Sequence, residues 1–210
     1  KIGNVSWFKS IFNLHQNKEN NFNSKFCRRL AYDEILANLL VLSRVRKRIK
    51  KFKKDKKIFD NYLTKKIINN FNFKLTKNQI EIINEINIDL ESGCKMFRLL
   101  QGDVGSGKTI VSFLAAANVI RSKWQVALMA PTEILAKQHY DLAMKIFKST
   151  DVTIKFLTGK SDHKEKKLIQ GNLKNGKINF LIGTHALFQK NIFFKNLGLV
   201  IIDEQHKFGV

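Results

Sequence analysis

The residues best suited to carry out chemistry form one glycine-rich segment, Gly102-Asp103-Val104-Gly105-Ser106-Gly107-Lys108-Thr109. Glycine at three of these positions lets the backbone take positive φ angles and turn its N–H groups toward phosphate oxygens. Lys108 would then reach the β- and γ-phosphates of a nucleotide, and the Thr109 hydroxyl would join the ligands of Mg²⁺. A glycine-rich turn that binds nothing is the alternative. The complete pattern favours a site for a nucleoside triphosphate.

The segments on either side of this loop indicate how it is held. Residues 96–100 form an apolar run that predicts a strand, and residues 110–120, rich in Ala, Val and Leu, predict a buried helix. A helix that begins near Thr109 would aim the positive end of its dipole at bound phosphates. Strand, loop and helix in this order are the setting in which the motif binds nucleotides.

An acidic pair follows a second apolar run. Residues 199–202 predict a strand, and Asp203-Glu204-Gln205-His206 come directly after it. Asp203 would hold Mg²⁺ mainly through water, because this ion gives up its hydration shell reluctantly. Glu204 would orient or deprotonate the attacking water. Such a pair can also simply begin a loop, but its place downstream of the phosphate loop favours hydrolysis of the nucleotide.

The elements that must position these residues alternate between helix and strand from residue 71 onward. Helices are expected at 77–90, 110–120, 132–147 and 161–173, and strands at 96–100, 125–130, 152–157, 178–182 and 197–202. The strands are mostly continuous apolar runs, which is typical of a parallel sheet covered by helices on both faces. Pro131 ends one strand at the carboxyl edge, where such α/β folds bind ligands.

The N-terminal third has a different character. Residues 1–24 are polar and rich in Asn, whereas residues 26–68 carry apolar side chains at three- and four-residue steps and predict helix. Ten Lys and Arg residues lie between positions 44 and 57. Two interpretations of this block stay open, a solvated helix face and a stripe that follows a phosphate backbone.

The composition adds limited information about partners. The net charge of +21 suggests a polyanionic partner, but 31 of the 38 basic residues are Lys beside many Asn, Ile and Phe, as an AT-rich coding sequence would give. Cys27 and Cys94 are far apart and without metal-site spacing, so we expect reduced thiols in a cytoplasmic protein. No apolar run approaches the length of a membrane span. The absence of an initiator Met leads us to expect a piece of a longer protein.

Several of these motifs resemble those of superfamily 2 helicases and translocases. Asp-Glu-X-His at 203–206 resembles motif II, residues 73–79 resemble the Q motif, whose Gln79 would read adenine, and residues 130–136 look like motif Ia. The resemblance implies that four residues past strand ends contact the DNA backbone, namely Pro131, Thr132, Thr184 and His185. Gln205 and His206 would relay the nucleotide state to the DNA groove. Taken singly, Thr132 or His185 could equally be a helix cap or a packed residue.

Three stretches indicate one family within this superfamily. Residues 100–109, 129–139 and 200–210 are similar to the RecG-type ATP-dependent DNA helicases. Residues 29–37 also look like that family's segment between the DNA-binding wedge domain and the first motor lobe. The transcription-repair coupling translocases are the alternative, but they carry an aromatic residue where Ser106 stands and Glu where Gln205 stands. Lys207 replaces the usual Arg, which keeps the charge and loses the planar fork.

A RecG-type identity would imply a bacterial, cytoplasmic motor that uses ATP and Mg²⁺ to remodel branched duplex DNA in recombination and repair, without a membrane partner. Residues 1–24 would end the wedge domain or a linker, 25–70 would form a basic helical linker, and 71–210 would form most of a RecA-like lobe with a doubly wound, mostly parallel sheet.

A second RecA-like lobe of the same parent chain would supply an arginine finger. The isolated chain would therefore bind nucleotide weakly and hydrolyse it at a negligible rate. A phosphate-loop kinase or GTPase and a non-catalytic nucleic-acid-binding remnant are the rival hypotheses.

Overall fold

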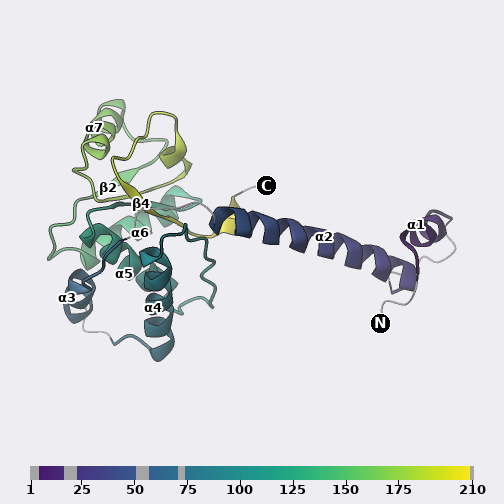
Figure 1. Cartoon of the computed structure of the whole chain (residues 1–210). Coiled ribbons are helices and arrows are strands. Elements are labelled where there is room, and N and C mark those ends of the chain that lie inside the picture. Colours follow the sequence, from purple (N-terminus) through teal and green to yellow (C-terminus); the bar gives the residue numbers. More distant parts are fainter. Residues whose placement is uncertain (1–4, 17–22, 51–56, 71–73, 209–210) are drawn as a thin grey trace. The chain divides into compact units, whose positions relative to one another are not determined.

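The computed structural model describes residues 5–16, 23–50, 57–70 and 74–208 (Figure 1). The chain divides into two compact units, the first comprising residues 1–54 and 94–97 and the second comprising residues 55–93 and 98–210. The first unit contains helices α1 (Trp7–His15) and α2 (Lys25–Lys50), which contact each other. The predicted domain boundaries at residues 24 and 70 stay a prediction.

The helix expected over residues 26–68 is interrupted. Helix α2 ends at Lys50, residues 57–61 are not helical, and α3 spans Tyr62–Asn70. Helix α1 was not predicted; it begins at Trp7 and is capped by Ser6, whose side chain accepts a hydrogen bond from the backbone N–H of Lys9. Within the basic block, residues 51–56 lie outside the described residues, and Lys57 is buried with its ammonium group 4.7 Å from the centre of the Trp124 ring. Lys57 therefore does not belong to an exposed basic stripe.

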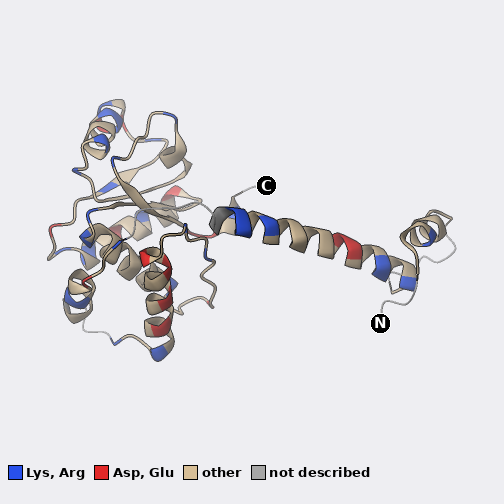
Figure 2. Cartoon of the chain, in the orientation of Figure 1, with Lys and Arg blue, Asp and Glu red and all other residues tan. Residues whose placement is uncertain are grey.

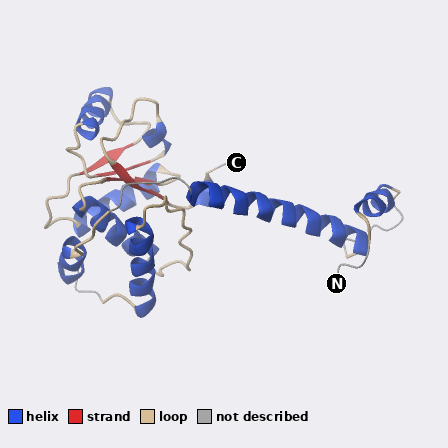
Figure 3. Ribbon diagram, in the orientation of Figure 1, coloured by secondary structure: helices blue, strands red, loops and turns tan. Residues whose placement is uncertain are grey.

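The second unit is built around one sheet in which every pair of neighbouring strands is parallel. Its strands are β1 (Gln125–Met129), β2 (Ile154–Leu157), β3 (Phe180–Gly183) and β4 (Leu197–Ile202), in the order β2-β3-β1-β4. Helices surround the strands in Figure 3. They are α3, α4 (Lys77–Glu91), α5 (Lys108–Arg121), α6 (Glu133–Ile146) and α7 (His163–Lys174), with short 3₁₀ helices η1 (His185–Phe188) and η2 (Gln205–Lys207). The predicted α/β fold with a parallel sheet is confirmed.

Apolar side chains cover both faces of the central strands β1 and β3. On one face, the buried ring of Phe113 on α5 meets the rings of Phe147, the residue that follows α6, and Phe180 on β3. On the other face, residues of α7 and η1 pack against β1, β2 and β3, and this cluster includes Ala127, Leu157, Ile169, Leu173, Leu181 and Leu187. Strands β1 and β3 are buried throughout, as their continuous apolar sequences predict.

One expected strand is absent from the described sheet. Residues 96–100 were predicted to be a strand, yet residues 95–100 carry no regular secondary structure, and Phe97 and Leu99 are exposed. A strand forms only where a neighbour takes up its backbone hydrogen bonds. β1 and β3 each lie between two other strands, so a further strand could join this sheet only beside β2 or β4, and residues 95–100 are not part of the described sheet. The apolar sequence was therefore not sufficient to place residues 96–100 in the described sheet.

Strand β4 also differs from the expectation that both faces are covered. Val200 and Ile202 are 42% and 46% exposed, so β4 is only partly buried. Val200 lies opposite Ala127 in the register of the sheet and lines an apolar groove together with Phe188 and Phe194. Val200 and Ile202 alternate with the more buried Leu199 and Ile201, so one face of this edge strand is the less covered one.

Three helices of the second unit are joined by a buried polar side chain. Asn118, in the last turn of α5, is 1% exposed. Its carbonyl oxygen accepts from the Thr64 hydroxyl on α3 at 2.6 Å, and its amide nitrogen donates to Asn87 on α4 and to Asn61, both at 3.1 Å. Because a buried amide is costly without partners, this network fixes the positions of α3 and α4 against α5. Among the described helices, none is both long enough and apolar enough to cross a bilayer.

Candidate nucleotide site and strand-end edge

The glycine-rich segment forms a loop at the start of α5. Gly105 and Gly107 have φ angles of +82° and +84°, values that side chains strongly disfavour. Gly107 occupies the residue before α5, and its carbonyl accepts the backbone N–H of Val111 at 3.2 Å. The loop is exposed up to Ser106. Its backbone can therefore present N–H groups and a helix N-terminus to an anion, as the sequence predicts.

Lys108 folds back over this loop. Its ammonium group donates to the carbonyl oxygens of Gly102 at 2.7 Å and Asp103 at 2.8 Å. The same Asp103 carbonyl accepts the N–H of Ser106 at 3.2 Å. Lys108 is thus held by backbone carbonyls at the mouth of the loop. Because these are neutral acceptors, a phosphate oxygen would compete effectively for the same ammonium group.

Gln79 contacts the loop directly. Its side-chain amide nitrogen donates to the Ser106 carbonyl at 3.0 Å, and its side-chain oxygen accepts the Thr76 N–H at 3.0 Å. The Thr76 hydroxyl in turn accepts the Gln79 N–H at 3.3 Å, so Thr76 and Gln79 form the capping box that begins α4. The resemblance to the Q motif predicted that Gln79 binds adenine. The geometry adds a second role, because Gln79 connects α4 to the phosphate loop, and we call this contact the tether.

The other predicted residues lie along the carboxyl edge of the sheet. Three backbone hydrogen bonds connect neighbouring strand ends: Thr184 N–H to the Leu157 carbonyl (3.3 Å), Ala130 N–H to the Gly183 carbonyl (2.9 Å), and Asp203 N–H to the Met129 carbonyl (2.9 Å). Neighbouring strands lie about 4.8 Å apart. The structure therefore places the segments that begin at Ala130, Thr184 and Asp203 next to one another on one edge.

Asp203 makes a contact that the sequence analysis missed. The Nε2 atom of His139 on α6 lies 2.6 Å from Oδ2 of Asp203. The His139 ring also meets Phe113 edge to face, with ring centroids 6.3 Å apart. A signal was present in the sequence, because His139 falls on the buried stripe of α6 with Ala136 and Ala143. A polar ring on such a stripe needs a partner.

Glu204 has an unusual backbone conformation. Its φ and ψ angles are 49° and 47°, in the left-handed region that residues with a Cβ seldom occupy. This conformation costs about 1–2 kcal/mol and turns the chain directly into η2. The Glu204 carboxylate lies 3.3 Å from Nε2 of His206, and its side chain is 37% exposed. Glu204 and His206 are thus brought together, while Gln205 begins η2.

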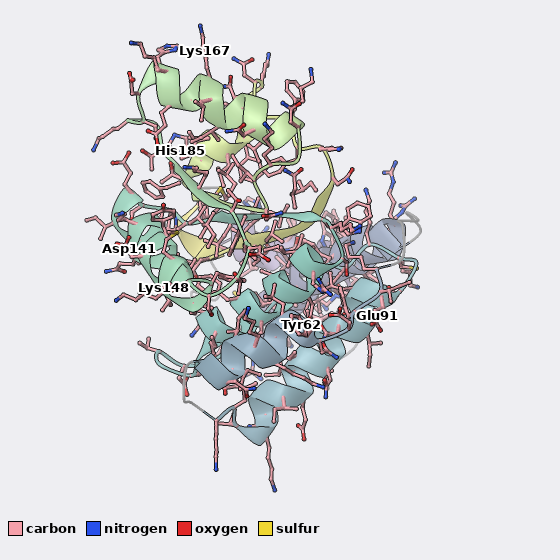
Figure 4. All side chains as sticks on the ribbon, turned by 90° about the vertical axis from the view of Figure 1, so that its left-hand side faces the viewer. Tyr62, Glu91, Asp141, Lys148, Lys167 and His185 are labelled. Carbon is pink, nitrogen blue, oxygen red and sulfur yellow. The ribbon has the colours of Figure 1, made fainter. Side chains whose placement is uncertain are left out.

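The four residues predicted to contact DNA differ in exposure. Thr132 is exposed and caps α6, with its hydroxyl accepting the Leu135 N–H at 3.3 Å. His185, labelled in Figure 4, is exposed and begins η1, and Pro131 is partly buried. Thr184 is 3% exposed, and its hydroxyl is buried without a hydrogen-bond partner in the described structure. The Thr184 hydroxyl therefore does not lie on the surface of this edge.

A basic residue beside this edge was also missed. Lys160 follows β2, is highly exposed, and forms an ion pair of 2.9 Å with Glu133 in the first turn of α6. The hydrogen bond from Lys160 lowers the pKa of Glu133. Further Lys side chains of α7, with Lys167 labelled in Figure 4, extend outward from that helix. Figure 2 shows that Lys and Arg are spread over many elements, so charge alone did not single out Lys160.

Comparisons with known proteins agree with these motifs. Residues 76–210 match the model of the DEAD/DEAH box helicase family. The ATP-dependent DNA helicase RecG of Aquifex aeolicus is 46% identical over 206 residues, which are 95% of this chain and 26% of that protein. RecG of Bacillus subtilis is 40% identical over 205 residues, covering 97% of this chain and 30% of that protein.

A solved structure is similar as well. It is the structure of RecG bound to a three-way DNA junction, which matches with a TM-score of 0.80 and 43% identity over 88% of this chain and 25% of that chain. This chain thus spans between a quarter and a third of the length of these relatives. The predicted resemblance to RecG is confirmed. The chain therefore belongs to the DEAD/DEAH box helicase family and is a member of the RecG type.

Proposed function

We propose that the protein containing this chain is an ATP-dependent DNA helicase that remodels branched duplex DNA in bacterial recombination and repair, and that this chain contributes one half of its ATP site. The observation that carries the proposal is the phosphate loop at the start of α5, whose positive-φ glycines and Lys108 stand ready for phosphate oxygens. The RecG relatives, one of them bound to a three-way junction, support DNA as the partner.

The residues of the site fit ATP and Mg²⁺ by their chemistry. A Cβ added at Gly107 would run into the Gln79 side chain, so glycine at this position lets Gln79 pack against the phosphate loop. Thr109 and Asp203 offer the hard oxygen ligands that Mg²⁺ prefers. The described residues contain no group of three His, Cys, Asp or Glu side chains that could hold a metal ion. Mg²⁺ bound together with a nucleotide takes most of its ligands from phosphates and water, and one or two protein oxygens complete its shell.

Each residue has a distinct task in this account. Lys108 neutralises charge on the β- and γ-phosphates, and Gln79 holds the loop and reads adenine. Asp203 orients the hydrated Mg²⁺, which would shield the phosphate charge. Glu204 accepts a proton from the attacking water as that water bonds to the γ-phosphorus and the bond to the bridging oxygen breaks. A second lobe of the full-length protein would stabilise the departing phosphate charge, so this chain alone would hydrolyse ATP very slowly.

The carboxyl edge would meet the DNA backbone. We assign phosphate contacts to Thr132 and His185, which are exposed past the ends of β1 and β3, with Pro131 shaping the turn between β1 and Thr132. Thr184 is left out of these contacts, because its hydroxyl is buried and its backbone N–H already donates to the Leu157 carbonyl. His206 beside Glu204, together with Gln205, would pass the state of the nucleotide to this edge. Such contacts fix the position of the duplex without reading its sequence.

The proposal is tested by substituting Lys108 with Ala in the full-length protein. ATP hydrolysis stimulated by a three-way junction should be abolished, whereas binding of the junction, measured by fluorescence anisotropy, should remain largely intact. Retained hydrolysis would contradict the assignment of the ATP site. Loss of both activities together would show that Lys108 supports the fold rather than the reaction.

A further inference from the structure

His139 on α6 contacts two residues from different parts of the fold. One is Asp203 at the carboxyl edge of the sheet, and the other is Phe113 on α5, the helix that follows the phosphate loop. His139 lies two turns into α6, on the side of the helix that also carries the buried residues Ala136 and Ala143. Its side chain is only 12% exposed, and its Nε2 atom lies 2.6 Å from Oδ2 of Asp203. Because a carboxylate only accepts hydrogen bonds, this nitrogen carries the proton and donates it.

The His139 ring packs against a core residue of α5. Phe113, which is completely buried on α5, meets the His139 ring edge to face at an interplanar angle of 70°. Phe113 follows Thr109 by four residues and therefore stands one helical turn beyond it on the same face of α5. The ring cannot turn away from Asp203 without disturbing this packing. The donor is therefore fixed in place before any ligand arrives.

The Asp203 backbone is fixed independently. Its N–H donates to the Met129 carbonyl at 2.9 Å, which continues the hydrogen bonds between β4 and β1 past the last residue of β4. The remaining freedom of Asp203 lies in its side chain, which is 31% exposed. The bond from His139 engages one carboxylate oxygen. It leaves the other oxygen, Oδ1, for the hydration shell of a metal ion.

We propose that His139 is a positioning residue for the magnesium-binding carboxylate, linking α6 and the core of α5 to Asp203. The inference rests on the proposed ATP site and adds to it a residue that the helicase motifs do not single out. A donor of this kind fixes the orientation of a carboxylate ligand, and its removal typically lowers metal affinity or activity by about 10- to 100-fold. Phosphate binding by the loop itself does not depend on this contact.

Three substitutions separate the hydrogen bond from the packing. His139→Leu keeps an apolar side chain against Phe113 but removes the donor. His139→Gln keeps a donor, because the amide nitrogen of Gln can occupy nearly the position of Nε2. His139→Asn keeps the amide on a side chain one methylene shorter, which does not reach Asp203, and replaces His139→Leu if that variant fails to fold. Thermal unfolding of each full-length variant checks that the fold is retained.

The experiment measures binding of a fluorescent ATP analogue to the full-length protein, first in EDTA and then with increasing Mg²⁺. For His139→Leu we expect unchanged affinity in EDTA and an increase of about tenfold or more in the Mg²⁺ concentration at half-saturation. His139→Gln should restore most of the wild-type value. The Mg²⁺ dependence of ATP hydrolysis should shift in parallel.

Two results would overturn the inference. One is a Mg²⁺ requirement of His139→Leu equal to that of the wild type; the other is an equal loss of nucleotide affinity with and without Mg²⁺, which indicates a role in the fold alone. Lys108→Ala, measured alongside, tests the ATP site itself. If Lys108→Ala binds the nucleotide as the wild type does, the proposed site fails. If it loses binding while His139→Leu is unchanged, only the role of His139 fails.

Discussion

Replacing Gln79 with alanine should weaken nucleotide binding even though the substituted side chain donates to no phosphate. The Gln79 amide holds the Ser106 carbonyl at 3.0 Å, and Ser106 lies between the two positive-φ glycines of the loop. Without this bond the loop must be ordered by the nucleotide itself, and the cost of ordering lowers the affinity. The substitution also removes half of the capping box with Thr76.

The size of the effect follows from the hydrogen bond between the Gln79 amide and the Ser106 carbonyl. A single neutral hydrogen bond contributes about 0.5–1.5 kcal/mol net. Since 1.4 kcal/mol corresponds to a tenfold change in an equilibrium constant, loss of the tether should raise the Kd about two- to tenfold. Thr76→Ala is the matched control, because it removes the cap at a cost of about 0.5–2 kcal/mol in stability and leaves the Ser106 contact in place.

The assay is displacement of a fluorescent ATP analogue from the full-length protein by ATP and, separately, by inorganic tripolyphosphate. For Gln79→Ala, both competitors should bind more weakly than to the wild type, because both need the ordered loop. For Thr76→Ala, both should bind nearly as to the wild type despite a lower unfolding midpoint. If tripolyphosphate bound Gln79→Ala and the wild type equally well, Gln79 would act on adenine alone and the tether would be refuted.

Three further predictions concern the fold that holds the site. Asn118→Leu should lower the free energy of unfolding by about 1–3 kcal/mol in chemical denaturation, since the buried Thr64 hydroxyl loses its acceptor; an unchanged value would contradict the role of the network. Gly183→Ala should lower it by about 1–3 kcal/mol or more, because the new Cβ meets the Leu157 carbonyl, whereas Gly171→Ala, with open space around its Cβ, should be neutral or stabilising. Lys160→Met should raise the pKa of Glu133 toward its usual value of 4.5 in a carboxyl NMR titration. The pKa of Glu133 is lowered in the folded protein, so its ion pair with Lys160 stabilises the fold at pH values above 4.5 and is lost as the pH falls. The wild type should therefore lose more stability on acidification than Lys160→Met.

Local patterns in the sequence predicted the residues that act through backbone geometry. The phosphate loop was predicted because glycine spacing and the following Lys108 report directly on the loop's conformation. The parallel sheet was predicted because continuous apolar runs alternate with helical segments. Burial of β1 and β3 bears this out.

The features that the sequence did not predict depend on contacts between residues that lie far apart in the chain. Residues 96–100 have a strand-like sequence, but strand formation depends on a neighbour, which the local pattern does not contain. The bond from His139 to Asp203 joins residues far apart in the chain, and only the register of β4 beside β1 makes it possible. Thr184 matched a motif by type and spacing, while its burial depends on how the end of β3 packs.

The most direct test of the half-site account compares ATP hydrolysis by this 210-residue chain with hydrolysis by the full-length protein, each with and without a three-way DNA junction. The account predicts that the chain alone binds nucleotide weakly and shows negligible turnover under both conditions, whereas the full-length protein is strongly stimulated by the junction. Robust junction-stimulated turnover by the chain alone would contradict it, because the residues described here would then suffice for the reaction.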